Sequence, residues 1–181
     1  MSTRENLLDA FEQILIAEGE RAATMDAVAA LAAVSKGGLL YHFRSKDALV
    51  DGLVERLTEL AQQDVARMAC AEQGPSAYYV GTSAYQGSAL DRALVATARL
   101  VQDANPAASE AMRRLQQDWY ELIAAEVGDR AVARAILLLG DGLYYNAALA
   151  GGTPGVTDAT APEDLAELLG VVELLKEQAT R

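Results

Sequence analysis

The sequence predicts an all-α fold, with a small N-terminal three-helix domain followed by a larger helical domain. Along most of the 181 residues, apolar residues recur at the three- and four-residue intervals of an amphipathic helix. Nowhere do apolar and polar residues alternate over enough positions to predict a strand. Turn-forming pairs such as Gly74-Pro75 and Gly128-Asp129 separate the helical stretches.

The first three predicted helices are short and follow one another closely. Gly19 ends the first helix, because glycine tolerates the left-handed conformation found there. Thr24 is a good N-cap for the second helix, and Asp26 in its first turn suits the positive end of the helix dipole. Ser35 caps a third helix that runs to about Phe43. The apolar stripe of the first helix consists of Leu7, Leu8, Phe11, Ile14 and Leu15.

A long fourth helix is predicted after Ser45, because nothing interrupts its apolar stripe before Gly74-Pro75. At the usual helical rise, about 26 residues span about 39 Å, enough to run from one domain into the next. We therefore place the domain boundary on this helix. A helix-turn-helix domain over residues 1–46 then precedes a regulatory and dimerisation domain over residues 47–181.

The second domain is predicted to consist of further helices. Residues 78–85 are ambiguous, since glycines at 81 and 87 weaken a helix there. Helices are predicted over 90–101, over the amphipathic stretch that follows Asn105-Pro106, and over about 163–180. Residues 131–150 also form a helix in this prediction, and it is apolar on nearly every face. The composition of residues 151–162, GGTPGVTDATAP, is typical of a loop.

Composition restricts where the protein acts. No apolar run is long enough for a membrane helix, and the N-terminus lacks the pattern of a secretion signal. We therefore expect a cytoplasmic protein without a membrane partner. A single cysteine, Cys70, agrees with a reducing compartment and is expected to serve as a small apolar residue of its helix.

The charge distribution favours a small DNA-binding surface. The net charge of −11 by itself argues against nucleic-acid binding. However, residues 27–46 contain no Asp or Glu, yet they carry Lys36, Arg44 and Lys46. Residues 48–181 hold 10 basic and 19 acidic side chains, so most of the excess negative charge lies downstream. Such a body repels the duplex outside the basic segment and discourages non-specific binding.

Residues 24–46 predict a helix-turn-helix, because two short helices with a tight connection follow a packing helix and precede a long one. Lys36 begins the third helix, where its side chain can enter the major groove and bind guanine O6 and N7. Gly37 and Gly38 carry no side chain and let that helix approach the bases closely. Thr24 and Ser35 offer hydroxyl groups to phosphates.

Three further residues are placed to bind phosphates at the other end of the third helix: Tyr41, His42 and Lys46. His42 is the only histidine and has no partners for a metal site. A helix-capping or backbone-binding role for His42 is an open alternative. Tyr41 is assigned to the surface because its neighbour Leu40 is the better candidate for the core.

The segment SKGGLLYHFRSKDALV, residues 35–50, resembles the signature of the TetR/AcrR family of bacterial transcriptional regulators, with similarity over residues 4–60. The resemblance implies an N-terminal DNA-binding domain and a C-terminal domain that dimerises and often holds a small ligand. It also implies repression of transcription, which is the usual activity of the family's members. By position it implies DNA contacts for Thr24, Ser35, Lys36, Gly37, Tyr41, His42 and Lys46.

Three residues depart from the family pattern. Leu40 stands where many members have a DNA-contacting tyrosine, which predicts that one contact is missing. Glu20 replaces the aromatic residue that commonly follows Gly19. Ala33 replaces the glycine usual before Val34, which predicts strain or a changed turn.

The second domain is expected to bind a small apolar or amphipathic effector, because it combines a few large rings with many small residues. The alternative is that its aromatic residues are core and dimer-interface rings. The lining that we predict consists of Met68, Leu94, Leu100, Met112, Trp119 and Tyr144.

The last two helices predict a homodimer. Residues 131–150 are too apolar for a solvated helix, and the final helix carries a leucine-rich stripe. Two such helices from each subunit can form a two-fold four-helix interface. The alternative is that they pack only against their own domain. The predicted interface residues are Leu138, Tyr145, Leu149, Leu168, Leu169, Val172 and Leu175.

No catalytic or cofactor motif appears in the sequence: there is no nucleophile elbow, phosphate loop or metal-ligand spacing. We therefore expect a non-enzymatic homodimeric repressor without cofactors, which binds a palindromic operator in double-stranded DNA and is released by a small-molecule effector. The alternative is a helical ligand-binding or adaptor protein that does not bind DNA. Substitution of Lys36 and Lys46 distinguishes the two.

Overall fold

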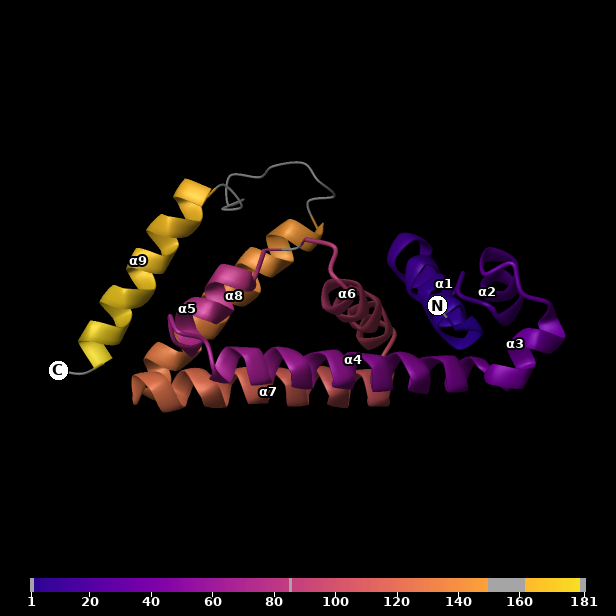
Figure 1. The fold of residues 1–181 in the computed structure, drawn as a ribbon, viewed down its shortest axis with the longest axis horizontal. Coiled ribbons are helices and arrows are strands. Elements are labelled where there is room, and N and C mark those ends of the chain that lie inside the picture. The colour runs from indigo at the N-terminus through magenta and orange to yellow at the C-terminus, as the bar shows by residue number, and fades with distance from the viewer. Residues whose placement is uncertain (1, 85, 150–161, 180–181) are drawn as a thin grey trace. The chain divides into compact units, whose positions relative to one another are not determined.

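A computed structural model describes residues 2–84, 86–149 and 162–179, and every regular element in these ranges is an α-helix (Figure 1). The predicted all-α fold is thereby confirmed. The helices are α1 (Thr3–Glu18), α2 (Met25–Leu31), α3 (Lys36–His42), α4 (Lys46–Ala69), α5 (Pro75–Thr82), α6 (Ala89–Gln102), α7 (Pro106–Val127), α8 (Arg130–Leu149) and α9 (Pro162–Ala179).

Local signals account for most helix ends. The Thr24 and Ser35 hydroxyl oxygens accept hydrogen bonds from backbone N–H groups in the first turns of α2 and α3, at 3.2 and 3.1 Å. The ambiguous stretch contains α5, whose first residue, Pro75, has the fixed φ that suits a first turn. Ser88 and Asp91 form a capping box that starts α6.

The chain divides into two compact units, Met1–Ala61 with Gly87–Arg114, and Gln62–Gln86 with Leu115–Arg181. Helices α4 and α7 contribute residues to both. The expected boundary at residue 46 falls where α4 begins, whereas the compact units also group α6 with α1, α2 and α3. In the first unit, α1 packs against α2 and α6.

A partly buried ion-pair cluster joins α1 to α4 within the first unit. The Arg56 guanidinium donates to Glu5, Asp9 and Glu12 at 2.5, 2.7 and 2.9 Å. Burial raises the pKa of the Glu12 carboxyl, although the Arg56 charge opposes this shift. Because Glu12 is only 1% exposed, its carboxylate depends on Arg56 for compensation, and the pair holds the two helices in register.

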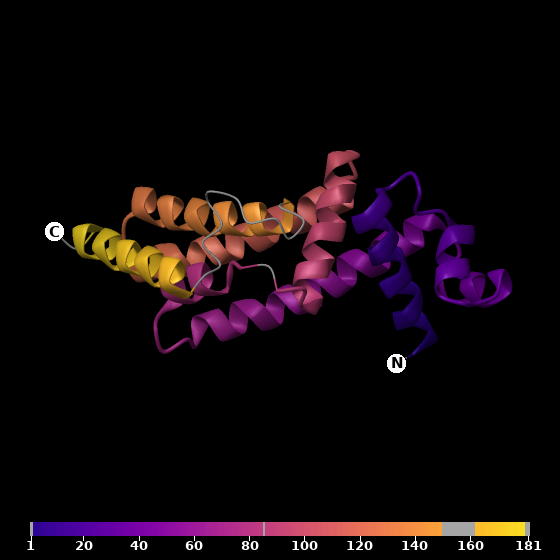
Figure 2. The same cartoon turned by 90° about the horizontal axis from the view of Figure 1, so that it is seen from above.

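In the second unit, helices α5, α8 and α9 contact one another (Figure 2). Gly140 of α8 allows close approach of α5, because a Cβ there would collide with the Tyr79 ring. The Tyr79 hydroxyl donates to Asp141 at 2.7 Å, and its ring lies 5.3 Å from that of Trp119. The Trp119 indole donates to Asp64 at 3.0 Å. The polar atoms of both rings are therefore satisfied inside this unit.

Cys70 is exposed just beyond the end of α4, so it does not serve as a packed residue of that helix. The predicted loop lies outside the described residues except for Pro162, which begins α9. Among the helices that the structure describes, none has the length and apolar character needed to cross a bilayer.

Candidate nucleic-acid interface

The turn between α2 and α3 is built by backbone hydrogen bonds around a left-handed residue. The Val34 N–H donates to the Ala29 carbonyl at 2.9 Å, and the Ala33 N–H to Ala30 at 3.1 Å, the pattern of a Schellman motif. Ala33 has a φ of 53°, where a Cβ costs roughly 1–2 kcal/mol. The strain expected from the missing glycine is therefore present.

Helix α3 has one buried face and one exposed face. Leu39 is fully buried, and Phe43 just beyond the helix is 3% exposed, so this side anchors α3 in the first unit. The exposed side combines positions three and four residues apart, which lie next to one another on a helix. It consists of Lys36, Gly37, Leu40 and Tyr41, and we call it the outward face of α3. The expectation that Leu40 belongs to the core is therefore wrong, because Leu39 occupies the buried position of this turn.

The only charged side chain of the outward face is Lys36, and it forms an ion pair with Asp26 at 2.9 Å. The side chains are 65% and 74% exposed, so the pair contributes little free energy and exchanges readily with another anion. Thr24 and Ser35 use their hydroxyl oxygens as caps, which leaves each O–H group free to donate.

The two glycines of α3 differ in their surroundings. A Cβ on Gly38 would lie 2.9 Å from Val34 Cγ1 and 3.3 Å from Ser35 Oγ, so a larger residue here would force these side chains to shift. A Cβ on Gly37 would meet nothing within 4 Å. The chain's own packing therefore explains Gly38 but not Gly37.

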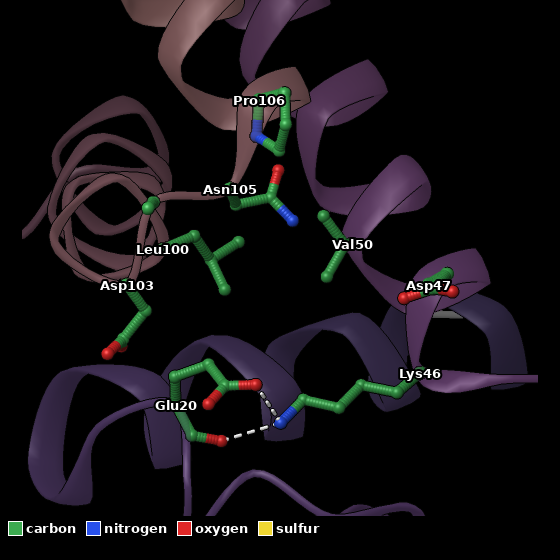
Figure 3. Close-up of a pocket in the computed structure, with 9 residues that line it drawn as sticks. Glu20, Lys46, Asp47, Val50, Leu100, Asp103, Asn105 and Pro106 are labelled. Atoms are coloured by element: carbon green, nitrogen blue, oxygen red, sulfur yellow. Dashed lines mark hydrogen bonds and ion pairs between the residues drawn. The ribbon is translucent and has the colours of Figure 1, made fainter.

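Lys46 is half-buried and forms an ion pair within the first unit. Its ammonium pairs with the Glu20 carboxylate and donates to the Glu20 carbonyl oxygen at 2.7 Å (Figure 3). The pair lies at a cavity of about 320 Å³, and Asp47 and Asp103 also line it. Glu20 is one of the departures from the family pattern. It therefore forms an ion pair with the lysine that was expected to bind DNA.

The end of α3 carries two exposed rings and an exposed arginine. Tyr41 is 84% exposed, and its ring lies edge-on to that of His42, with centroids 5.1 Å apart. Arg44 follows, and within the described residues it forms no ion pair or hydrogen bond. Sequence reasoning noted Arg44 in the basic segment but did not assign it a contact. The sequence feature that could have indicated a contact is its position: Arg44 is a cation between two predicted helices.

The residues predicted to line an effector pocket divide equally between the two units. Leu94 and Leu100 are buried in the first unit, and Met68 and Trp119 are buried in the second. The other two, Met112 in the first unit and Tyr144 in the second, are half-buried. Of all six, only Leu100 lines the cavity beside Glu20.

The residues predicted for the dimer interface differ in exposure. On α8, Leu138 and Tyr145 are 62% and 65% exposed and stand seven positions apart, so they share a helix face. On α9, Val172 is buried in its own unit, and three others are half-buried: Leu168, Leu169 and Leu175. The large apolar side chains that are exposed on the described part of α9 are instead Val171 and Leu174. The Leu149 side chain lies outside the described part of the chain.

Family models match most of the chain. Residues 7–53 match the model described as bacterial regulatory proteins, tetR family, and residues 74–173 match the model described as tetracyclin repressor-like, C-terminal domain. No curated protein matches the sequence significantly.

Solved structures of similar fold cover nearly the whole chain. A transcriptional regulator from Rhodococcus sp. Rha1 has a TM-score of 0.70 at 23% identity, over 98% of this chain and 97% of its own. The multidrug binding protein EbrR, complexed with malachite green, has a TM-score of 0.69 at 21% identity, over 95% and 96%. The ketosteroid transcriptional regulator KstR2 of Mycobacterium tuberculosis has a TM-score of 0.66 at 19% identity, over 94% of each chain.

Proposed function

The chain belongs to the TetR family of bacterial regulatory proteins, and we propose that it is a homodimeric repressor whose two α3 helices bind a palindromic operator. The observation that carries the DNA-binding part is the outward face of α3. It is exposed, it carries Lys36, and no acid occurs from residue 27 to residue 46. Such a face suits the negative potential of a major groove.

Within this proposal, Lys36 exchanges Asp26 for guanine O6 and N7. The hydroxyls of Thr24 and Ser35 donate to phosphates at one end of the motif, and Tyr41 and His42 bind phosphates at the other. We assign the remaining cationic phosphate contact to Arg44, because Lys46 already pairs with Glu20. Phosphate contacts position the protein, whereas Lys36 contributes sequence discrimination.

Selection of binding sites from a random DNA pool with the purified protein tests the proposal. We expect a palindromic site, and we expect Lys36→Ala to weaken its binding about 10- to 100-fold and to relax specificity at one base pair. Arg130→Ala is the matched control, since it also removes an exposed positive charge, here from α8, and should leave binding unchanged. Recovery of no palindromic site, or equal binding by the Lys36→Ala protein, contradicts DNA recognition by α3. That result favours the helical adaptor.

An amphipathic small molecule is the proposed effector. In support, the second unit combines the Tyr79 and Trp119 rings with the Asp64 and Asp141 carboxylates, and the similar protein EbrR was solved with malachite green. Helix α4 contributes residues to both units, so a ligand that tilts it changes the separation of the two recognition helices. A dimer that binds two half-sites needs its recognition helices about 34–36 Å apart, so a small change in this distance releases the DNA.

Malachite green is a first probe for the effector. A compound that binds only the folded protein stabilises it by RT ln(1 + [L]/Kd), so its melting temperature rises with the logarithm of ligand concentration once that concentration exceeds Kd. We expect compounds that raise the melting temperature also to weaken operator binding in a titration. If every stabilising compound leaves operator affinity unchanged, release by a tilt of α4 is excluded.

A further inference from the structure

Leu40 is exposed without a structural reason inside the chain. It is 41% exposed on the outward face of α3, whereas its neighbour Leu39 occupies the buried position of the same turn. The helix is therefore anchored without Leu40. A leucine in the middle of the proposed DNA-binding face also has no group that could donate or accept a hydrogen bond.

Gly37 makes the backbone next to Leu40 accessible. It precedes Leu40 by three residues and so lies beside it on the helix surface. Glycine in a helix costs about 1 kcal/mol relative to alanine, and open space surrounds the position where a Cβ would stand. A surface that approaches the outward face can therefore reach the backbone at Gly37 and the Leu40 side chain together.

The chemistry of the major groove restricts what Leu40 can contact. The base edges present hydrogen-bond donors and acceptors, and the one apolar group among them is the C5 methyl of thymine. Leucine pressed against a polar edge would exclude water without replacing its hydrogen bonds, which is unfavourable. Contact with a thymine methyl instead buries apolar surface on both partners.

We infer that Leu40 is a specificity-determining residue that contacts the C5 methyl of one thymine in each operator half-site. This inference rests on the proposed function and adds the base that α3 recognises. Lys36 and Leu40 are four residues apart, so they lie about 6 Å apart along the helix axis. Base pairs are stacked at about 3.4 Å, which places the thymine within about two base pairs of the guanine bound by Lys36.

Deoxyuridine tests this contact, because it differs from thymidine only in lacking the C5 methyl. Each thymine of the selected operator is replaced in turn, and affinity is measured for the wild-type protein and for Leu40→Ala. We expect one sensitive position per half-site, within two base pairs of the guanine at which Lys36→Ala relaxes specificity. At that position the wild-type protein should lose about fourfold in affinity, the value for one buried methyl group.

The Leu40→Ala protein should bind the thymidine and deoxyuridine operators equally at that position. Leu31→Ala is the control, since Leu31 is a similarly exposed leucine on α2, and it should retain the wild-type sensitivity. Unchanged melting temperatures exclude an effect on folding. Failure to select any operator contradicts the proposed function. An operator that depends on Lys36 but has no thymine methyl coupled to Leu40 overturns the present inference alone.

Discussion

The ion pair between Lys36 and Asp26 sets the starting state of the proposed base contact. Both side chains are mostly exposed and 2.9 Å apart. An exposed pair of this kind contributes about 0–1 kcal/mol, so DNA can displace Asp26 at little cost. Asp26 nevertheless leaves one negative charge beside the surface that would meet the phosphates.

Asp26→Asn should therefore strengthen operator binding. The substitution frees Lys36 and removes a charge that repels the duplex, so we expect affinity to rise about two- to fivefold at low salt, the equivalent of a weak surface ion pair. Fluorescence anisotropy with labelled operator measures the change. Asp118→Asn, which removes an exposed charge from α7, should have no effect. Weaker binding by the Asp26→Asn protein would show that Asp26 holds Lys36 in its productive position.

Ala33 stores conformational strain at the turn of the helix-turn-helix. Its φ of 53° is one that glycine adopts without penalty. Ala33→Gly should therefore raise the free energy of unfolding by about 1 kcal/mol. Urea unfolding followed by circular dichroism measures it. Ala30→Gly, inside the exposed side of α2, should lower it by about the same amount. A destabilised Ala33→Gly protein would contradict the assignment of strain.

At the scale of elements, Glu126 of α7 binds residues of two other helices in the second unit, α5 and α9. Its carboxylate accepts from the backbone N–H and hydroxyl of Ser76 in α5, at 2.7 and 2.5 Å. It also pairs with Lys176 of α9 at 2.9 Å. Burial alone would raise the pKa of Glu126, but these hydrogen bonds outweigh burial and hold the pKa below its ordinary value.

A carboxyl group with a lowered pKa in the folded state stabilises the fold above its unfolded pKa, and this stabilisation is lost as the pH falls through the folded pKa. At neutral pH, Glu126→Gln should therefore reduce the free energy of unfolding by about 2 kcal/mol. The difference from wild type should shrink below about pH 4.5.

The difference in unfolding free energy is measured by urea unfolding followed by fluorescence of the single tryptophan, Trp119. This tryptophan lies in the second unit, as Glu126 does. Glu121→Gln is the control, because Glu121 is exposed on the same helix and should leave stability nearly unchanged across this pH range. A difference between wild type and Glu126→Gln that stays constant down to about pH 3 would show that the charge of Glu126 contributes nothing.

At the scale of the whole molecule, the proposed repressor depends on dimerisation. A chain with a net charge of −11 offers DNA only one small basic surface, so two linked copies are needed for tight binding. The exposed apolar residues Leu138 and Tyr145 on α8, and Val171 and Leu174 on α9, are the candidates for the two-fold interface.

Tyr145→Asp should shift the protein from dimer to monomer, because it places a charge where the partner would bury an aromatic ring. Sedimentation velocity at micromolar concentration measures the change, and operator affinity should fall together with dimerisation. Tyr41→Ser is the matched control. It removes a comparably exposed ring from α3 and should weaken DNA binding while leaving the dimer intact. A wild-type monomer, or a dimer unaffected by Tyr145→Asp, would contradict an interface on α8.

The sequence alone determined the helical fold and the helix-turn-helix pattern, because both depend on neighbours a few residues apart. Caps at Thr24 and Ser35, the end of α1 at Gly19 and the strain at Ala33 all follow from local backbone preferences. The apolar stripe of α1 also indicated the core correctly, since helical periodicity determines which residues share a face.

Only the tertiary structure decided which charged residues form ion pairs and which apolar residues stay exposed. Glu20 and Lys46, like Glu12 and Arg56, are far apart in the sequence, so no local pattern shows that they pair. Packing of α9 against α5 and α8 turned Val172 inward and left Leu174 exposed, although both belong to one leucine-rich helix. The helix-turn-helix was thus predictable from local chemistry. Which of its cations are unpaired, and which of its apolar residues are exposed, depends on long-range contacts. These form only when distant segments pack together.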